Sequence, residues 1–329
     1  MTKLDTMLAQ VPQLIHRPYL IQVEPVRGCN MQCDFCANHR LPPRHEYMTL
    51  GTAAAIAEQL RAFGPKQKIQ LAMRGEPLLH PDLEGVLGVM RAILPASQLG
   101  IVTNGLGLSR NRLRMLYGAG CNIVSVDCYN GRYESIGSKL GGIVPVYSYR
   151  DFNALHYHSH KVRALVLIED LATDSKGSRT FTNQCGFIPD AAYEKYDIPR
   201  PVPGRPVLKS CTNLFRELPF HFNGNVPVCC KDWLGDSVHY NVHSNLSLIE
   251  YWHESRKLNM MRLMLMAKNR SFWPCAQCTY FGGFRKGLLP KLPHIDADMQ
   301  FNIAKELGQW RALDGSGQPR GRAKRPRRK

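Results

Sequence analysis

The 329-residue sequence lacks an apolar run approaching the roughly 20 residues that a membrane-spanning helix requires. Its first twenty residues include acidic Asp5 and Pro12, where a secretory signal would need an uninterrupted apolar stretch. No internal repeat is evident along the chain. These absences argue against a membrane protein, a secreted protein and a repeat array, and we expect a soluble protein of the cytoplasm.

Acidic residues are also scarce, because 43 lysines and arginines face 26 aspartates and glutamates and give a formal net charge of +17. Residues 320–329 hold seven basic residues and no acid, and subtracting these seven from +17 leaves +10. A basic body with a basic tail attracts phosphate polyanions such as DNA or RNA. The alternative is a solvated tail that serves only solubility.

Short β-rich runs alternate with helical stretches from Tyr19 onward. Thr49 is the expected N-cap of the first of these helices. The pattern predicts strands at 20–26, 68–73, 99–104, 122–127 and 161–168, and helices at 49–63, 81–93 (opened by a proline) and 108–118. Such βα units indicate an α/β fold with a parallel sheet, whose functional loops follow the carboxyl ends of the strands. Periodicity does not tell an open sheet from a barrel.

The alternation stops at residues 170–210, which are rich in Ser, Thr, Gly and Pro and predict a connection to a smaller domain. Asn223-Gly224 stands between two β-like runs and predicts a hairpin. Residues 246–268 have the pattern of one amphipathic helix, and a last helix is expected near 296–310. We expect the tail from Asp314 to be disordered.

The eleven cysteines are an odd number and are clustered, which favours metal ligation over disulfide bonds. Cys29, Cys33 and Cys36 lie in one loop. Three thiolates leave one iron of a [4Fe-4S] cluster without a protein ligand, whereas a structural zinc site is closed by four ligands. A structural zinc loop or three buried thiols are the alternatives.

With Phe35 before its last cysteine and a strand ahead of it, this loop resembles the cysteine motif of the radical S-adenosylmethionine (radical SAM) enzymes. The resemblance covers about residues 19–170. It implies a partial (β/α)6 barrel and a [4Fe-4S] cluster whose open iron binds S-adenosylmethionine. It also implies reductive cleavage to a 5′-deoxyadenosyl radical, hydrogen abstraction from a substrate, and an electron donor such as flavodoxin or ferredoxin.

The stretch "MRGEP" (73–77) resembles that family's glycine-glutamate-proline motif, which implies that Gly75, Glu76 and Pro77 contact S-adenosylmethionine. Arg74 departs from the motif, because many relatives have another glycine there. Glycine permits a close backbone approach and proline stiffens the turn. Closing a turn is the alternative role for Glu76.

Further residues at strand ends match the family's pattern. "TNG" (103–105) and "SVD" (125–127) recur near the ribose and the substrate, so Asn104 is an expected cofactor contact or, alternatively, a helix cap. Arg163 is expected to pair with the carboxylate of S-adenosylmethionine or to be a solvated residue at a strand start. Cys128 and Tyr129 are candidates for a hydrogen donor or a substrate contact, with burial favoured for Cys128.

A second cysteine group comprises Cys211, Cys229, Cys275 and Cys278. Four cysteines close a site, and zinc is the alternative. Their spacing resembles the twitch domain, a shortened SPASM domain, which implies one fully ligated auxiliary [4Fe-4S] cluster that passes electrons. Cys185 and Cys230 fit this spacing less well and are interpreted as structural or spare thiols.

The resulting domain prediction has four parts: a lead-in at 1–18, a radical SAM barrel at 19–200, an auxiliary-cluster domain at 201–290, and a helix with a basic tail at 291–329. The charge favours a nucleobase, or a side chain attached to one, in DNA or RNA as the substrate. Peptide maturation and small-metabolite chemistry are the alternatives. A zinc-binding nucleic-acid module is the alternative from another class.

Overall fold

The computed structural model describes residues 2–40, 45–129, 132–156, 162–168, 182–200, 210–280 and 295–309. The tail from Asp314 with its basic stretch 320–329, and much of the predicted connection at 170–210, lie outside the described residues. Among the helices described, none has both the length and the apolar character needed to cross a bilayer.

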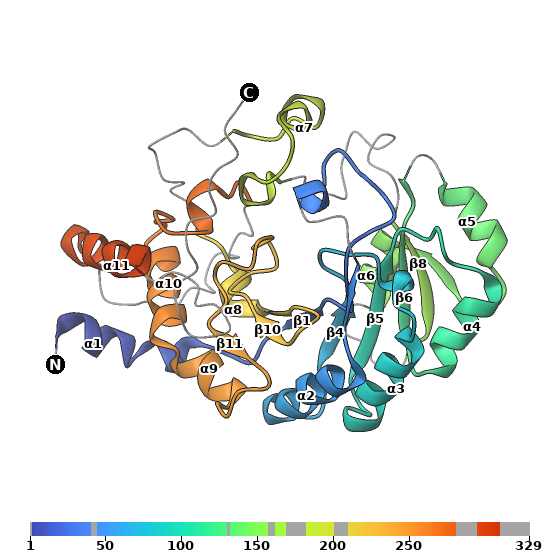
Figure 1. Cartoon of the computed structure of the whole chain (residues 1–329), viewed down its shortest axis with the longest axis horizontal. Coiled ribbons are helices and arrows are strands. Elements are labelled where there is room, and N and C mark those ends of the chain that lie inside the picture. Colours follow the sequence, from blue (N-terminus) through green and yellow to red (C-terminus); the bar gives the residue numbers. More distant parts are fainter. Residues whose placement is uncertain are drawn as a thin grey trace.

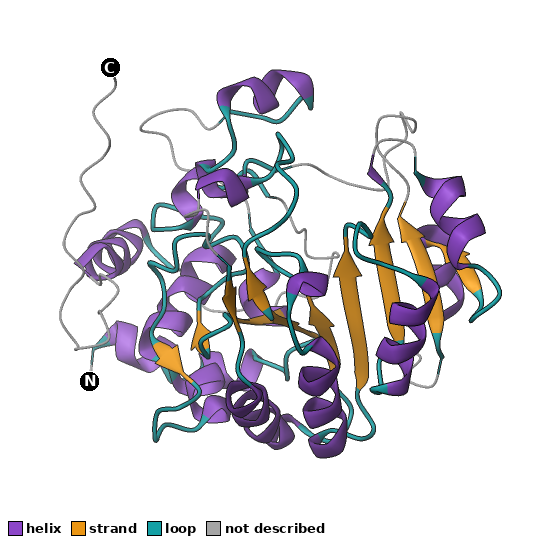
Figure 2. Cartoon of the chain, turned by 45° about the vertical axis from the view of Figure 1, so that its right-hand side comes forward, coloured by secondary structure: helices purple, strands orange, loops and turns teal. Residues whose placement is uncertain are grey.

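A seven-stranded sheet organises the chain, with the strand order β7-β8-β6-β5-β4-β1-β9. Every neighbouring pair in it is parallel, and Figure 2 shows the arrows pointing the same way. The loops that follow these strands therefore gather at one edge, as predicted. The strands are β1 (Leu20–Val23), β4 (Lys68–Leu71), β5 (Gln98–Thr103), β6 (Ile123–Asp127), β7 (Val146–Ser148), β8 (Ala164–Ile168) and β9 (Glu217–Phe220).

Helices that follow the first strands pack beside one another along the outer side of this sheet (Figure 1). The hydroxyl of Thr49 accepts from the backbone N–H of Thr52, which confirms the predicted N-cap. The next helix begins after Asp82 as its N-cap, and the predicted opening proline precedes that cap. These helices are α2 (Leu50–Leu60, continued by the 3-10 turn Arg61–Phe63), α3 (Leu83–Ile93), α4 (Arg110–Gly118) and α5 (Tyr133–Leu140).

The sequence pattern missed α5, β7 and the helix α6 (Tyr149–His156). β7 lies at the edge of the sheet beyond β8, where Val146 pairs with Leu165. Its burial pattern shows exposed and half-buried side chains only, so it has no apolar alternation to reveal it.

The predicted hairpin at Asn223-Gly224 is wrong. β9 pairs in parallel with β1, where Leu20 faces Glu217, while β10 (Asn225–Val226) pairs with β11 (Tyr240–Asn241). Gly224, at φ 80°, still makes a turn, which connects β9 to β10. A strand expected in a separate domain thus extends the barrel sheet, because the edge of β1 supplies a four-residue ladder.

The helix predicted at 246–268 is two helices, α9 (Leu248–Glu254) and α10 (Arg256–Met266). The helix is interrupted at Ser255, whose hydroxyl accepts from the N–H of Leu258 and caps α10. α10 is not amphipathic, because residues 257–265 are all buried. The helix predicted near 296–310 is confirmed as α11 (Ala297–Gln309).

The lead-in at the start of the chain packs on the second region, which comprises the described residues 210–280 and 295–309. Helix α1 (Lys3–Leu8) contacts α10, and Arg256 forms an ion pair with Asp5 at 2.8 Å. Figure 1 shows α1 beside α10 and α11, away from the barrel helices. The remaining elements are 3-10 turns at Val11–Leu14, Ala37–Arg40, Pro77–Leu79, Gln184–Gly186 and Cys275–Gln277, the ribbon β2 (Val26–Arg27) with β3 (Glu46–Tyr47), and the helices α7 (Asp190–Lys195) and α8 (Asn213–Arg216).

Candidate active site

The loop with the first three cysteines follows β1 and β2, at the edge where the parallel strands end (Figure 1). Cys29, Cys33 and Cys36 are all half-buried. The backbone N–H of Cys36 donates to the carbonyl of Cys33 at 3.0 Å, so the last four residues of the motif form a tight turn. The fold places this loop at the edge of the sheet where the functional loops of parallel sheets gather.

Gly75 approaches the backbone of this cysteine loop. A Cβ atom added at residue 75 would lie 2.0 Å from the carbonyl oxygen of Val26 and 2.6 Å from that of Gly28. The N–H of Glu76 donates to the same Gly28 carbonyl at 2.9 Å. Only glycine fits at this position, and its close approach anchors the loop after β4 to the cysteine loop.

The buried carboxylate of Glu76 accepts three hydrogen bonds. Thr103 donates its hydroxyl at 2.5 Å and Asn104 its backbone N–H at 2.8 Å. The N–H of Leu78 donates at 3.0 Å, so Glu76 also closes the turn that begins at Pro77. Burial raises the pKa of Glu76, while these hydrogen bonds act in the opposite direction. Glu76 thus joins the loops after β4 and β5.

Asn104 connects this network to the thiols. Its side-chain amide donates to Asn30 Oδ1 at 2.8 Å and reaches Cys29 Sγ at 3.7 Å. The helix after it is capped by Ser109, so capping α4 is not the role of Asn104. Arg132, which the sequence analysis did not single out, donates to the Asn104 carbonyl at 2.9 Å.

Aromatic rings surround Phe35. Its ring centroid lies 5.5 Å from that of Tyr129 and 5.5 Å from that of Tyr196, the second in an edge-to-face arrangement. Tyr129 donates its hydroxyl to Asp127 at 2.9 Å. Lys195 forms an ion pair with Asp34 at 2.6 Å, which ties α7 to the cysteine loop.

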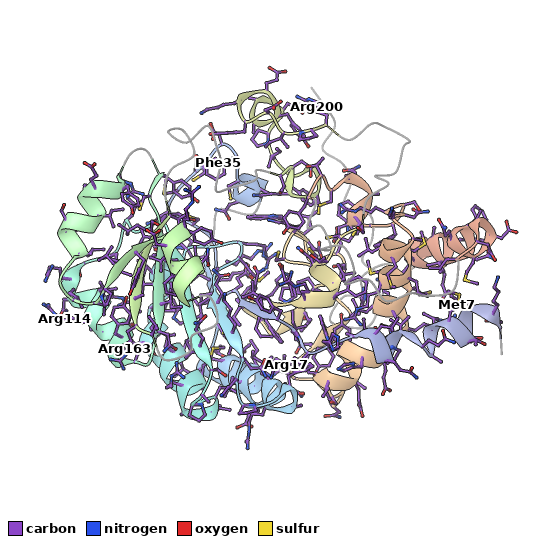
Figure 3. The ribbon with its side chains drawn as sticks, turned by 180° about the vertical axis from the view of Figure 1, so that it is seen from behind. Met7, Arg17, Phe35, Arg114, Arg163 and Arg200 are labelled. Carbon is purple, nitrogen blue, oxygen red and sulfur yellow. The ribbon has the colours of Figure 1, made fainter. Side chains whose placement is uncertain are left out.

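Arg163 does not lie at this site. It is exposed just before the amino end of β8, and Figure 3 shows it at the opposite end of the sheet from Phe35. A parallel strand starts at one edge and ends at the other, so the predicted pairing with the carboxylate of S-adenosylmethionine does not arise from this position.

Cys128 is buried, as favoured, and its thiol donates to the carbonyl of Val126 at 3.4 Å.

Arg74 forms a buried ion pair that the sequence analysis missed. Its guanidinium binds the Glu24 carboxylate through two bonds of 2.7 and 2.6 Å, and its third donor reaches the carbonyl of Trp233 at 2.8 Å. Both charged side chains are almost completely buried. The only signal in the sequence was an arginine in place of a motif glycine. Arg74 attaches the "MRGEP" loop to β1 and to the second region.

Comparison with known proteins places this site in a family. The sequence model of the radical SAM superfamily matches residues 23–152, which include the cysteine loop, Gly75, Glu76 and Asn104. This segment is therefore similar to the radical SAM superfamily. The chain is 29% identical over 129 residues to GTP 3′,8-cyclase of Staphylococcus aureus, a match that spans 37% of each protein.

The fold agrees with this assignment. The crystal structure of BtrN in complex with AdoMet and 2-DOIA is 20% identical, with a TM-score of 0.59 over 80% of this chain and 93% of that chain. An open conformation of BtrN gives a TM-score of 0.54. The seven-stranded parallel sheet is thus consistent with the partial barrel of radical SAM proteins, as the sequence predicted.

Radical SAM proteins use a [4Fe-4S] cluster and S-adenosylmethionine, and the residues present suit that cluster. Burial raises the pKa of Cys29, Cys33 and Cys36, the last to about 12, so the charge of a bound metal cluster would favour the thiolates. Buried Trp233 packs with Ala37 and Cys36, and within the described residues its indole Nε1 has no hydrogen-bond partner. An N–H donor beside a ligand loop is suited to cluster sulfur.

The second cysteine group is built from distant segments. Cys211 precedes α8, Cys229 follows β10, Cys275 begins a 3-10 turn, and Cys278 directly follows that turn. All four are buried. Each of Cys211 and Cys275 lies within electrostatic range of Cys278. In the described parts of the chain, no three His, Cys, Asp or Glu side chains stand close enough to hold a single metal ion.

The two cysteines interpreted as spare differ in their surroundings. The thiol of Cys230 reaches Glu217 Oε2 at 3.6 Å. Cys185 is buried and lies within electrostatic range of Cys278, Cys229 and Cys275. The neighbouring Cys278 raises the pKa of Cys185, and Cys185 lowers that of Cys278. Cys185 therefore belongs to the second thiol group, which sequence spacing did not reveal.

Proposed function

We propose that this chain is a radical SAM enzyme in which Cys29, Cys33 and Cys36 hold the [4Fe-4S] cluster that binds S-adenosylmethionine. When bound, these groups supply the electron and the 5′-deoxyadenosyl radical that abstracts a hydrogen atom from the substrate. One observation carries the proposal: three half-buried thiols lie in a single loop at the carboxyl edge of the parallel sheet.

The residues around these thiols hold the loop in place. Gly75 packs against its backbone, and Asn104 is hydrogen-bonded to Asn30 within it. Glu76 keeps the loop after β5 aligned with the loop after β4 through Thr103 and Asn104. Such preorganised contacts hold a reacting group in a fixed position, where small displacements are costly in rate.

Tyr129 is the proposed contact for the substrate side of the site. It lies within electrostatic range of all three thiols, and its ring packs near that of Phe35. Its hydroxyl is held by Asp127, at the end of β6. The two rings place apolar surface beside the thiols, which favours exclusion of water from a reactive radical.

We further propose that Cys211, Cys229, Cys275 and Cys278 hold an auxiliary [4Fe-4S] cluster. Their burial and mutual proximity support this assignment. Four protein ligands leave no open iron, so the role of such a cluster is to pass electrons, with an external donor such as flavodoxin or ferredoxin supplying the first one.

The proposed substrate contains a nucleobase, as a nucleotide or within DNA or RNA. The net charge of +17 and the basic stretch 320–329 support a polyanionic substrate. The similar protein GTP 3′,8-cyclase acts, by its name, on a nucleotide, although the match covers only 37% of its length.

Anaerobic reconstitution tests the two clusters. About eight irons and a similar amount of sulfide per chain are expected from two [4Fe-4S] clusters. About four irons would refute the auxiliary cluster alone. Zinc with negligible sulfide would refute the radical chemistry and favour the zinc-binding alternative.

The substrate class is tested by measuring 5′-deoxyadenosine formation with DNA, nucleotide and peptide pools side by side. The full chain is compared with a chain lacking residues 318–329. Stimulation by polynucleotide at low salt, reduced by the truncation, is expected. Stimulation by peptides alone would replace the nucleobase proposal with peptide maturation.

A further inference from the structure

Basic residues gather where the strands of the parallel sheet begin, at the edge opposite the cysteine loop. Because all neighbouring strands run the same way, the residues just before each strand meet at one edge. The residues that we call the basic edge precede β1, β4, β8 and β9 and are Arg17, Lys66, Arg163 and Arg216. Figure 3 shows Arg17 and Arg163 at the end of the sheet that lies away from Phe35.

Packing around Tyr19 brings the cations of β9, β1 and β4 close together. The N–H of Tyr19 donates to the carbonyl of Arg216 at 2.7 Å. The Arg216 guanidinium lies 4.6 Å from the centre of the Tyr19 ring, and Lys68 Nζ lies 5.8 Å from it. A Cβ atom added at Gly64, in the turn before β4, would lie 3.6 Å from Arg17 Nη1.

Arg91 continues the positive charge toward β8. Its guanidinium donates to the carbonyl of Ser97, just before β5, at 2.7 Å and to that of Gly120, before β6, at 2.8 Å. It lies within electrostatic range of Arg163, which precedes β8. Positive side chains therefore follow the amino ends of β9, β1, β4, β5, β6 and β8, in the order of the sheet.

The side chains of the basic edge are exposed and have no acidic partner. Among the residues that the structure describes, none of these four cations forms an ion pair. Exposed cations elsewhere do form such pairs, as Lys3, Lys195 and Arg256 show. The charge of the basic edge is therefore available to a partner from outside the chain.

Two acidic side chains lie near the basic edge along the chain, and both bind other residues. Glu58, at the end of α2, pairs with Arg61 at 3.0 Å. Glu217, next to Arg216, accepts from the side chain of Gln22 at 2.9 Å. The alternative role of the basic edge is to offset the partial negative charge at the ends of α2, α3 and α4, which reach this side of the sheet.

The position of the basic edge favours one class of anionic partner. An acidic electron donor must approach the cysteine loop, which lies at the other edge, beyond the length of β5 (about 20 Å for six residues). The phosphate backbone of a polynucleotide needs only a row of exposed cations, because it binds by releasing its counterions.

We propose that the basic edge is a docking surface for the phosphate backbone of a polynucleotide, separate from the cysteine loop. The inference goes beyond the proposed function, because such binding needs neither a cluster nor S-adenosylmethionine. Contacts of this kind position a nucleic acid without reading its sequence.

The experiment measures binding of a fluorescently labelled DNA duplex to the full chain by anisotropy, at about 50 and about 200 mM salt. One variant combines Arg17→Gln, Lys66→Gln and Arg163→Gln. The matched control combines Arg150→Gln, Lys268→Gln and Lys305→Gln, which removes the same charge from exposed residues outside the basic edge. Each chain is also measured without residues 318–329, so that the basic tail does not mask a loss.

We expect the basic-edge variant to bind at least about tenfold more weakly at low salt, and its salt slope to fall by nearly three, since each phosphate contact contributes about 0.9. Arg163→Gln alone should lower the slope by about one. The control should bind within about twofold of the wild type.

Three results would overturn the inference. The wild-type chain could fail to bind the duplex, which would leave the basic edge with its structural role at the helix ends. The control could weaken binding as much as the basic-edge variant, so that only net charge matters. Poly-glutamate could compete as well as unlabelled duplex, which would indicate an acidic protein partner instead.

The substrate proposal is separable from this one. If the basic-edge variant loses the duplex as expected, while the duplex does not stimulate 5′-deoxyadenosine formation by the wild type, the docking surface is supported and the polynucleotide substrate is refuted. Stimulation that survives in a variant with unchanged binding would refute the docking surface and leave the substrate proposal standing.

Discussion

The two cysteine groups of this protein are assembled in different ways. Cys29, Cys33 and Cys36 share one loop and are half-buried at the open edge of the sheet. The second group is collected from separate turns and is buried, and Cys185 lies within electrostatic range of it. The difference shows that one loop can gather three thiols locally, whereas the second group depends on the whole fold around it.

Replacing Cys29, Cys33 and Cys36 together by alanine should have the largest effect. We expect complete loss of reductive 5′-deoxyadenosine formation and of about four of the eight irons, because the open iron is held by these thiols alone. Iron assay and product chromatography measure both. Unchanged cleavage of S-adenosylmethionine would contradict the assignment of the loop.

Replacing Cys275 and Cys278 by alanine should affect the proposed auxiliary cluster instead. About four irons should be lost, while cleavage of S-adenosylmethionine stays partly intact because the first loop is unchanged. The same two assays, run beside the triple variant, give the comparison. If the double variant abolished cleavage as completely as the triple variant, the two groups would not be separable as proposed.

The buried ion pair between Arg74 and Glu24 lies in the first region and is bonded to the second through the carbonyl of Trp233 and the N–H of Phe222. Its loss should therefore lower the stability of both regions together. Glu24→Gln leaves the Arg74 charge buried without its carboxylate, which should lower the free energy of unfolding by about 3–5 kcal/mol. Urea unfolding measures this change.

The exposed pair of Arg61 and Glu58 on the barrel surface supplies the matched control. Glu58→Gln should change the unfolding free energy by less than about 1 kcal/mol, because an exposed pair is solvated. Equal effects of the two substitutions on the free energy of unfolding would show that burial does not increase the contribution of the Arg74 pair to stability.

The second region should also respond to pH through His239. Burial, with the Lys257 charge beside it, lowers the pKa of His239 to about 3, from an ordinary value of 6.5. Because the unfolded chain takes up the proton first, stability through this group is complete above about pH 6.5 and falls as the pH drops toward 3.

Urea unfolding of the wild type and of His239→Leu at pH 7 and pH 5 tests this dependence. The loss of stability between the two pH values should be smaller in the variant, by at most about 2 kcal/mol. Exposed His45→Gln is the control and should behave as the wild type. Identical pH dependence in all three chains would mean that His239 takes up its proton at the same pH in the folded protein as in the unfolded chain.

Much of the first region followed from local chemistry. The Thr49 cap depends on one hydroxyl and the adjacent N–H groups, and the parallel strands follow from short apolar runs between helices. The cysteine spacing and Gly75 were also visible, because thiols within one loop and a glycine at a close approach are constrained by residues nearby in the chain.

The sequence by itself therefore determined the strands β1, β4, β5, β6 and β8, their shared polarity and the three-thiol loop, since each depends on neighbours within a few residues. Only the tertiary structure decided that β9 pairs with β1, that Arg74 binds Glu24, that Arg163 lies at the far edge, and that Cys185 lies within electrostatic range of Cys278. Each of these depends on which distant segments come into contact. Such contacts are selected by packing and by the pairing of buried polar groups across the whole fold, and spacing along the chain does not record them.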